Sequence, residues 1–416
     1  MSSHSRAFLW RLALLLAGLS MFGPFAIDAI FPAFPELQAQ FGVSHAAVQQ
    51  SISVYLIAYA LMSVFHGPVS DALGRRPVIL AGVAVFVLAC VGAALSQSLA
   101  GLLVFRALQG ISAGAGLIVG RALIRDCLEG NAAQKLMAQA TMIFSVAPAI
   151  APIVGGWILG WTDWHGIFWA MAIFALLVFF ACAIWLPETH PLAARTPLRI
   201  TSLARGSWAV LRNRRFMLLA LAACFNFGAL FIYIVSAPVL VLDYLGLNQQ
   251  QFGWLFVPIV VGLMIGSFLS SRLAGRLSQS ATAKLGFSMS ALAVLINLAY
   301  NLAADQIGLP WAVLPMGLNA CGVGLVFPLL TIAMLDMYPR QRGTAASMQA
   351  FTGLTFNAIL AGAAAPLLAP YRTGLSVAAL TMCAIGIGLW WRYRAGVKRE
   401  PPLDAPPQLL DDAERL

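Results

Sequence analysis

The fold is decided by a short polar stretch, Gly67–Pro77, whose sequence reads GPVSDALGRRP. It separates two apolar runs, 47–66 and 77–96. Each run is long enough to cross the roughly 30 Å hydrocarbon core of a bilayer as a helix. Because a turn this short leaves no room for a soluble domain, the stretch and its flanks predict a hairpin of two membrane-spanning helices.

Similar apolar runs extend from this hairpin to both ends of the chain. Of the 416 residues, 61% are hydrophobic and only 10% are charged, against about 25% charged in a soluble domain. Strands of outer-membrane barrels alternate apolar and polar residues in segments of about ten, whereas these runs are continuous. The fold class predicted is therefore all-α, a polytopic membrane protein. The twelve runs are 8–33, 47–66, 77–96, 101–123, 136–160, 166–186, 216–241, 252–271, 284–303, 310–334, 344–368 and 373–392.

The runs fall into two sets of six, separated by one long polar interruption. The strings Ser70–Arg75 and Ser271–Arg276 follow the second run of each set and share the pattern Ser-x-x-x-Gly-Arg. This match favours a duplication and two pseudo-symmetric six-helix bundles. The division expected is 1–186 for the first bundle, 187–215 for a linker, 216–394 for the second bundle and 395–416 for a disordered tail.

The linker contains apolar residues at helical spacing, Ile200, Leu203, Trp208 and Leu211, with arginines between them. Such a pattern favours a short helix that lies on the membrane surface. A disordered basic linker agrees with the composition equally well, so both alternatives stay open.

The basic residues predict the orientation. If the N-terminus is cytoplasmic, all Lys and Arg residues except Arg106 and Arg372 fall in cytoplasmic segments. The positive-inside rule therefore places both termini in the cytoplasm. The net charge of +10 is spread over seven short segments rather than gathered on one face, which excludes nucleic acid as a partner.

Cysteine and histidine give no sign of a metal or catalytic site. The six cysteines are scattered singly, and free cysteine inside an apolar run behaves as a small hydrophobic residue. The histidines form no ligand cluster and fall at segment ends or in loops, which predicts solvated or interfacial imidazoles. They are His4, His45, His66, His165 and His190.

The polar stretch has the pattern Gly-x-x-x-Asp-x-x-Gly-Arg-Arg, formed by Gly67, Asp71, Gly74, Arg75 and Arg76. It resembles the signature loop of the major facilitator superfamily and lies where that family has it. The resemblance implies a gate at the cytoplasmic ends of the helices. The alternative is an ordinary positively charged turn, in which glycine supplies backbone freedom and Asp71 accepts hydrogen bonds.

Arg106, Gln109 and Gly110 begin the fourth run. They resemble the Arg-x-x-Gln-Gly element of proton-driven members of the superfamily. A charged side chain within a span is costly and marks a functional site by default. The alternative is that Arg106 only extends to the interface, since it lies roughly 8 Å from the helix end at about 1.5 Å per residue.

Asp28 is the expected partner of Arg106, because it lies at a similar depth near the outer end of the first run. The segment Ile27–Pro35 resembles the helix-1 element of drug:proton antiporters. The resemblance implies that Asp28 and Arg106 couple transport to protons. The alternative is an acid at the membrane surface, and Ser20 stands where some drug exporters have a second acid.

Pro152, Gly155 and Gly156 close the fifth run. They resemble the antiporter element Gly-Pro-x-x-Gly-Gly, although Ala151 replaces one glycine. A packing face of small residues is the alternative. With the segment Trp164–Trp169, the chain is most similar to the bicyclomycin-resistance branch of multidrug exporters from Gram-negative bacteria.

The resemblance implies proton-coupled export of amphipathic antibiotics across the inner membrane, by a monomer that needs only the proton gradient and no cofactor. Alternatives are a carrier of one metabolite, such as a sugar, amino acid or siderophore, and a channel, scaffold or membrane enzyme. No nucleotide-binding loop supports an enzyme. Polar or aromatic residues within the runs are candidates for a substrate cavity, with helix packing as the alternative role: Tyr55, Tyr59, Asn226, Tyr233 and Asn319.

Overall fold

The structure is a computed structural model that describes residues 6–127, 130–195, 198–274, 276–338 and 341–397. Among these residues, ten helices have the length and hydropathy of membrane spans, and two shorter apolar helices accompany them. These helices correspond one for one with the twelve apolar runs, so the all-α polytopic fold is confirmed. The tail beyond Val397 and the glycine of the second Ser-x-x-x-Gly-Arg string lie outside the described residues.

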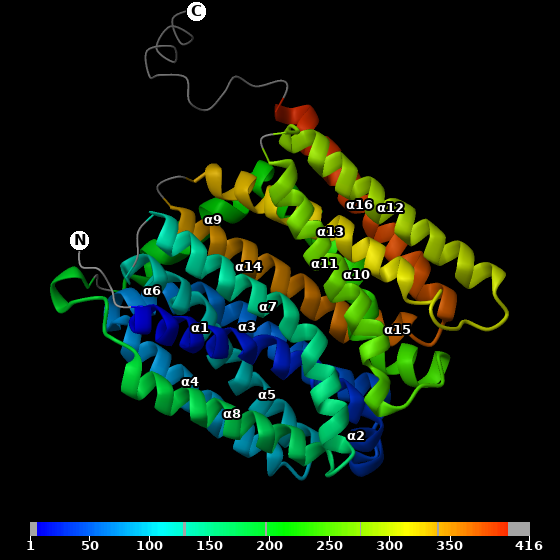
Figure 1. The fold of residues 1–416 in the computed structure, drawn as a ribbon, viewed down its shortest axis with the longest axis horizontal. Coiled ribbons are helices and arrows are strands. Elements are labelled where there is room, and N and C mark those ends of the chain that lie inside the picture. The colour runs from blue at the N-terminus through cyan, green and yellow to red at the C-terminus, as the bar shows by residue number, and fades with distance from the viewer. Residues whose placement is uncertain (1–5, 128–129, 196–197, 275, 339–340, 398–416) are drawn as a thin grey trace, which may run out of the picture.

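The first half of the chain forms one helical bundle (Figure 1). Its elements are α1 (Arg6–Asp28), η1 (Phe31–Ala33), α2 (Phe34–Phe41), α3 (His45–Leu73), α4 (Arg75–Ala94), α5 (Leu99–Gly114), η2 (Ala115–Val119), α6 (Gly120–Cys127), α7 (Gly130–Leu159), α8 (Trp164–Trp185) and η3 (Leu192–Ala194).

The second half forms another bundle beside it. Its elements are α9 (Ile200–Arg212), α10 (Arg214–Val235), η4 (Val239–Tyr244), η5 (Gln249–Gln251), α11 (Gly253–Leu273), α12 (Gln279–Ala303), α13 (Leu314–Asp336), α14 (Arg342–Ile359), η6 (Leu360–Ala364), α15 (Ala365–Leu368) and α16 (Arg372–Val397). The start of α1 and the end of α16 lie at the same side of the molecule (Figure 1), which we call the terminal face. The other ends of the helices form the opposite face.

The first apolar run does not remain one helix. Its α-helix ends at Asp28 and the chain continues through η1 into α2. Pro32 explains this end, because proline has no N–H to donate to the carbonyl of Asp28, four residues earlier, and its ring would collide with that carbonyl. Asp28 therefore lies at a helix end within the span.

The second run is longer than predicted. Helix α3 continues past Pro68 to Leu73 and ends at Gly74, whose φ of 102° suits glycine. His66 consequently lies inside a helix and is only 3% exposed. The prediction of a solvated or interfacial imidazole is wrong for His66, because the polar loop begins later in the chain than its composition indicates.

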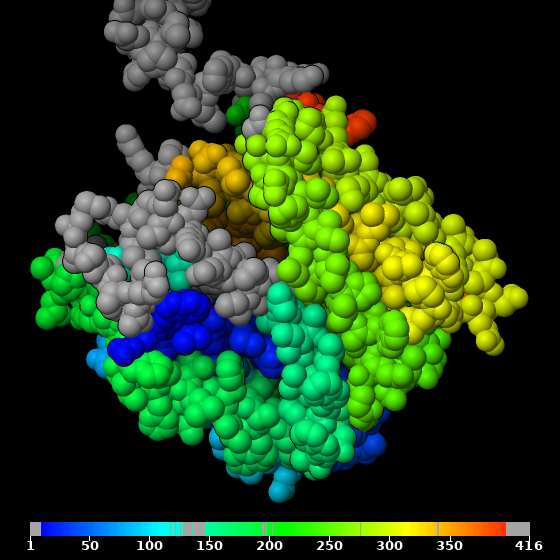
Figure 2. Space-filling model, in the orientation of Figure 1, coloured from blue at the N-terminus to red at the C-terminus, as the bar shows by residue number. Residues whose placement is uncertain are grey.

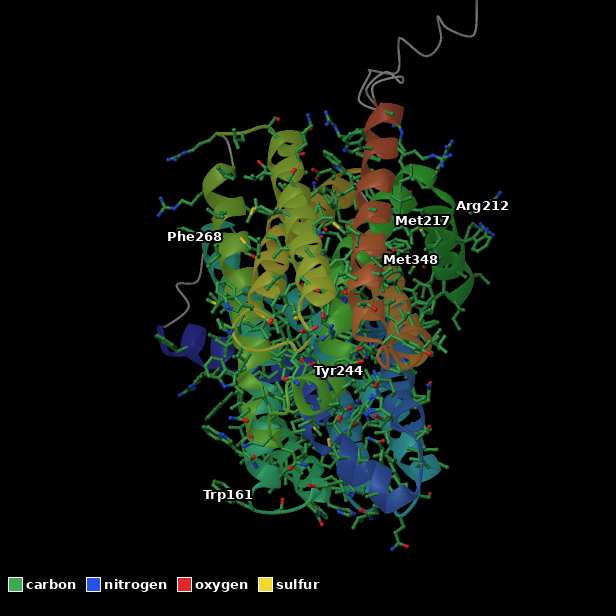
Figure 3. All side chains as sticks on the ribbon, turned by 90° about the vertical axis from the view of Figure 1, so that its right-hand side faces the viewer. Trp161, Arg212, Met217, Tyr244, Phe268 and Met348 are labelled. Atoms are coloured by element: carbon green, nitrogen blue, oxygen red, sulfur yellow. The ribbon has the colours of Figure 1, made fainter. Side chains whose placement is uncertain are left out.

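The linker contains the helix α9, so of the two alternatives the helical one is confirmed for the described residues. Val210 packs inward, whereas Ile200 and Trp208 are exposed. In Figure 3, α9 lies at the edge of the bundle and Arg212 points away from it.

The two bundles contact each other at the opposite face. Gln49 Nε2 donates to Val235 O at 2.8 Å, and Ser53 Oγ donates to Ala358 O at 2.9 Å. In the same region the ring of Phe31 stacks on that of Phe256, with 6.2 Å between centroids.

Towards the terminal face the bundles are less tightly joined. Figure 2 shows the surface hollowed beside α14, between α11 and α1. Residues 351–357 of α14 are all half-buried, and a Cβ placed on Gly353 would meet no atom within 4 Å. The described structure is thus closed at the opposite face and open towards the terminal face.

Small residues allow close helix packing within the second bundle. A Cβ on Gly262 of α11 would collide with the backbone carbonyl of Gly317 on α13. Without a large apolar driving force between helices in lipid, such close backbone contact is a main source of association.

We expect Gly262→Ala to lower the thermal unfolding midpoint of the purified protein in detergent. Alanine is a better helix former than glycine by about 1 kcal/mol. A loss of stability must therefore come from the collision of the new methyl group with Gly317. The matched control is Gly388→Ala, since a Cβ there meets nothing within 4 Å. That variant should match or exceed the parent protein. Equal stability of the two variants would contradict the packing argument.

Candidate functional site

Arg106 lies within α5 and is fully buried, with 0% of its surface exposed. Its Nε donates to Ser51 O at 3.1 Å and its Nη1 to Gln109 Oε1 at 2.7 Å. Its Cζ lies 4.7 Å from the ring centroid of Tyr55. The guanidinium is thus held inside the bundle by neighbouring groups rather than extended to an interface.

The two partner residues of the Arg-x-x-Gln-Gly element have distinct tasks. Gln109 accepts from Arg106 and donates its own Nε2 to Cys90 Sγ at 3.0 Å. A Cβ on Gly110 would collide with the backbone carbonyl of Tyr55. The glycine therefore lets α5 approach α3 closely enough for Arg106 to reach Ser51.

Asp28 is also buried, with 4% of its surface exposed. Among the described residues, no ion pair joins its carboxylate to Arg106. The structure brings both charges into the same bundle but does not pair them.

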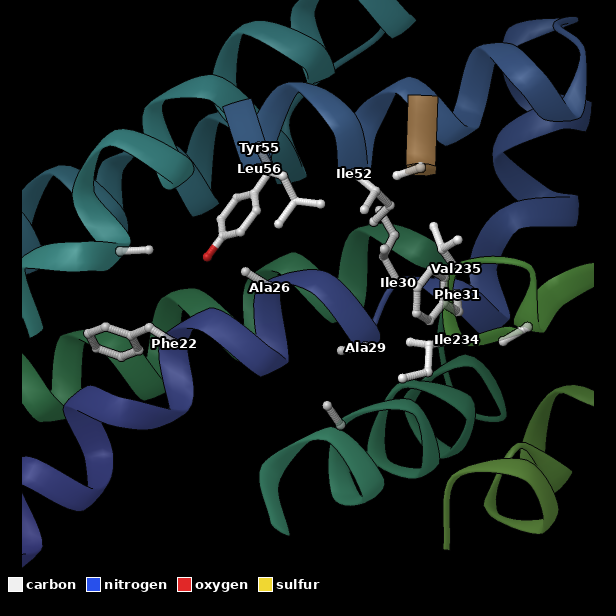
Figure 4. Close-up of a cluster of buried hydrophobic side chains, with 14 of the residues drawn as sticks. Phe22, Ala26, Ala29, Ile30, Phe31, Ile52, Tyr55, Leu56, Ile234 and Val235 are labelled. Carbon is white, nitrogen blue, oxygen red and sulfur yellow. The ribbon is translucent and has the colours of Figure 1, made fainter. Parts of the chain in front are cut away.

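Tyr55 contacts the guanidinium of Arg106 on one side. Its side chain extends from α3 towards α1 (Figure 4), and its hydroxyl oxygen is 4.0 Å from the Cβ position of Gly23.

Three buried polar atoms of this site lack a partner among the described residues. They are the Ser51 and Tyr55 hydroxyls and Arg106 Nη2. Since buried polar groups are nearly always hydrogen-bonded, their unmet capacity marks this place as one where a further polar group can bind.

The glycines of the antiporter element face in two directions. A Cβ on Gly155 would collide with the carbonyl of Ala29, beside Asp28. A Cβ on Gly156 would collide with the carbonyl of Gln249 in the second half, and Gln250 Nε2 donates to Gly156 O at 3.3 Å. Pro152 lies one turn earlier inside α7. This end of α7 therefore contacts both the break after α1 and the second bundle.

Ion pairs and hydrogen bonds of charged side chains stabilise the signature loop. Arg75 forms ion pairs with Asp71 and with Asp126 of α6, at 3.0 Å for the latter. Its backbone N–H donates to Glu188 Oε1 at 3.1 Å, and that of Arg76 to Glu188 Oε2 at 3.3 Å. All these contacts lie within the first half of the chain.

The two glycines of the loop differ in how closely they are packed. A Cβ on Gly74 would meet the carboxylate of Glu188, whereas one on Gly67 would meet nothing within 4 Å. Sequence reasoning missed Asp126 and Glu188. The sequence did contain a signal for each of them: Asp126 directly follows Arg125, and Glu188 directly follows Pro187.

The cavity candidates are all buried, with at most 8% of their surfaces exposed. Tyr55 and Tyr59 lie together on α3, with 6.2 Å between ring centroids. Tyr233 donates to Asn297 Oδ1 at 2.5 Å. The side-chain oxygens of Asn226 and Asn319 have no partner among the described residues.

The fold and this site define a class of protein: a multi-pass helical transporter made of two bundles, with buried polar groups between the membrane faces. A family model described as the Major Facilitator Superfamily matches residues 13–361. The chain belongs to this superfamily, and it is a transporter rather than an enzyme.

Similar proteins agree with this assignment. The chain is 28% identical over 356 residues to a bicyclomycin resistance protein homolog of Haemophilus influenzae, covering 83% of this chain and 87% of that protein. It is 28% identical over 379 residues to multidrug resistance protein D of Escherichia coli, covering 90% and 93%. The structure of the human organic anion transporter MFSD10 superposes with a TM-score of 0.69 at 20% identity, covering 92% and 99%. That likeness concerns the fold.

We expect Glu188→Gln to reduce stability by about 1 kcal/mol, because the carboxylate caps the first turn of α4. Thermal unfolding in detergent measures the change. Asp305→Asn, in an exposed loop, is the control and should have little effect. Equal losses in the two variants would show that Glu188 does not act through this cap.

Proposed function

We propose that the protein exports amphipathic drugs across the bacterial inner membrane in exchange for protons. The observation that carries the proposal is the buried carboxyl of Asp28 in the same bundle as the buried guanidinium of Arg106. A buried carboxyl of this kind in an apolar span marks a functional group by default. The names of the two bacterial relatives favour drugs over a single metabolite.

Asp28 acts as the proton carrier in this proposal. When it is protonated, the neutral carboxyl is compatible with the apolar surroundings and the carrier can close around it. When it is ionised, it attracts Arg106 or a cationic drug. Proton and drug therefore compete for one group, which is the requirement for exchange.

Alternating access would carry the exchange. The described structure is closed at the opposite face and open towards the terminal face, as one state of a rocking two-bundle transporter would be. We propose that the terminal face is cytoplasmic, since the basic residues gather there. A single chain with bundles at 1–186 and 216–394 is then sufficient to enclose the pathway.

The loop around Asp71 would act as the gate of the other state. In the described structure Arg75 is paired with acids of its own bundle. We propose that Asp71, whose side chain is 43% exposed, contacts the second bundle when the terminal face closes.

We expect Asp28→Asn to abolish proton-coupled export while the protein still reaches the membrane. The amide cannot exchange a proton. Proton release from the detergent-solubilised protein on addition of tetraphenylphosphonium measures the coupling directly, with Asp305→Asn as control. If Asp28→Asn still releases protons and exports the cation against its gradient, the assignment of Asp28 is wrong.

We expect Asp71→Asn to lower turnover at least fivefold and to leave drug affinity within twofold. The gate affects the exchange between states rather than binding. Asp336→Asn is the matched control, because Asp336 pairs with Arg342 at 3.3 Å on an exposed surface. Transport assays in vesicles measure turnover, and an unchanged rate in Asp71→Asn would refute the gate.

A further inference from the structure

Helix α3 carries a line of buried polar side chains from the site to the signature loop. Tyr55, Tyr59, Ser63, His66 and Ser70 follow one another at spacings of three or four residues, and each is at most 8% exposed. Residues at these spacings share one face of a helix. The line covers about 22 Å at 1.5 Å per residue. Polar side chains are costly to bury within a membrane span, so five of them on one face of a helix indicate a functional role.

His66 is the titratable group in the middle of this line. Its ring lies near the backbone of Met62 and Ile111. Its Nδ1 is enclosed and has no partner among the described residues. An imidazole whose other nitrogen carries the hydrogen keeps an electron pair on Nδ1 that can accept a proton.

Gly114 brings Tyr59 and His66 together. A Cβ there would lie 2.8 Å from His66 Cε1 and Nδ1, and 2.9 Å from Tyr59 Cε2. Both rings therefore occupy the space that a side chain would fill. The π-helical segment η2 begins directly after Gly114, and such segments are frequent at functional sites.

The line ends at the charged loop. Arg75 Nη1 donates to Ser70 Oγ, and the same guanidinium pairs with Asp71. A Cβ on Gly67 would meet nothing within 4 Å, so α3 is loosely packed on the side that carries Gly67.

Few other titratable groups face this part of α3. The segments η2, η6 and α15 contribute none. The remaining elements packed against α3 contribute Arg106 from α5, Arg75, Arg76 and Cys90 from α4, Arg342 from α14 and Glu36 from α2. No carboxylate of these elements lies between Asp28 and the loop to compete with His66.

We infer that His66, together with Tyr59, conducts the proton from Asp28 to the terminal face. This inference rests on the proposed proton coupling. Asp28 gives up its proton, the Tyr59 hydroxyl accepts one and passes on its own, and His66 binds the transferred proton at Nδ1. The imidazolium then releases a proton to water at the loop and becomes neutral, so no net charge stays behind.

The test compares His66→Gln with His45→Gln in proteoliposomes that contain a pH-sensitive dye, using tetraphenylphosphonium as substrate. His45 lies at the other end of α3. We expect His66→Gln to slow coupled proton movement at least tenfold with the KM for the cation within twofold, and His45→Gln to match the parent. The ratio of rates in H₂O and D₂O should rise in His66→Gln, because proton transfer becomes rate-limiting.

A rate loss without a change in this isotope ratio would show a structural effect and overturn the inference. Tyr59→Phe removes one oxygen and should show the same slower proton movement and the same rise in the isotope ratio. This variant replaces His66→Gln in the test if His66→Gln does not accumulate in the membrane. If the parent protein releases protons on substrate addition but both variants behave like it, only the relay is wrong. If the parent releases none, the proposed proton coupling fails, and the relay fails with it.

Discussion

A guanidinium without access to water is the constraint on which the first bundle depends. Arg106 cannot be left unsolvated, since an unpaired charge at this depth costs several kcal/mol. Its neighbours supply a backbone carbonyl, an amide oxygen and the face of the Tyr55 ring. These groups come from α3 and α5, so the two helices must approach closely, and Gly110 permits it. The position of Tyr55, and with it the surroundings of Asp28, follows from the need to hold one charge.

The end of α7 extends this constraint to the second half of the chain. Gly155 contacts the chain just after Asp28, and its neighbour Gly156 contacts Gln249 of the other bundle. Adjacent residues on one helix therefore touch the chain beside Asp28 and the interface between the bundles. In the proposed exchange, this short connection would link the charge on Asp28 to the relative position of the bundles.

The sequence predicted the all-α polytopic fold and the order of its apolar helices because membrane spans are read from apolar length, and ten of the twelve runs contain a helix of full span length among the described residues. It did not predict the end of α1 at Asp28, which depends on a single missing N–H at Pro32. It also placed His66 at a solvated boundary, since composition cannot show that α3 stays helical and buried beyond Pro68. Arg106 and Asp28 were identified from motifs, whereas Glu188 and Asp126 were missed because their contacts join distant segments through folding. Motifs identify residues, but only the fold shows which of them meet.

The two bundles share a topology but differ in chemistry. Among the described residues, the buried ionisable polar groups Asp28, His66, Arg75 and Arg106 belong to the first bundle, whereas the buried polar residues of the second bundle that are not aromatic are serine, threonine and asparagine. Neutral amides bind and release polar groups of a substrate without changing their own charge. If the two bundles rock as proposed, proton binding would stay on one side of the interface. In the proposed exchange, the substrate affinity of the second bundle would not depend on the proton, and protonation of the first bundle alone would decide when a substrate is released.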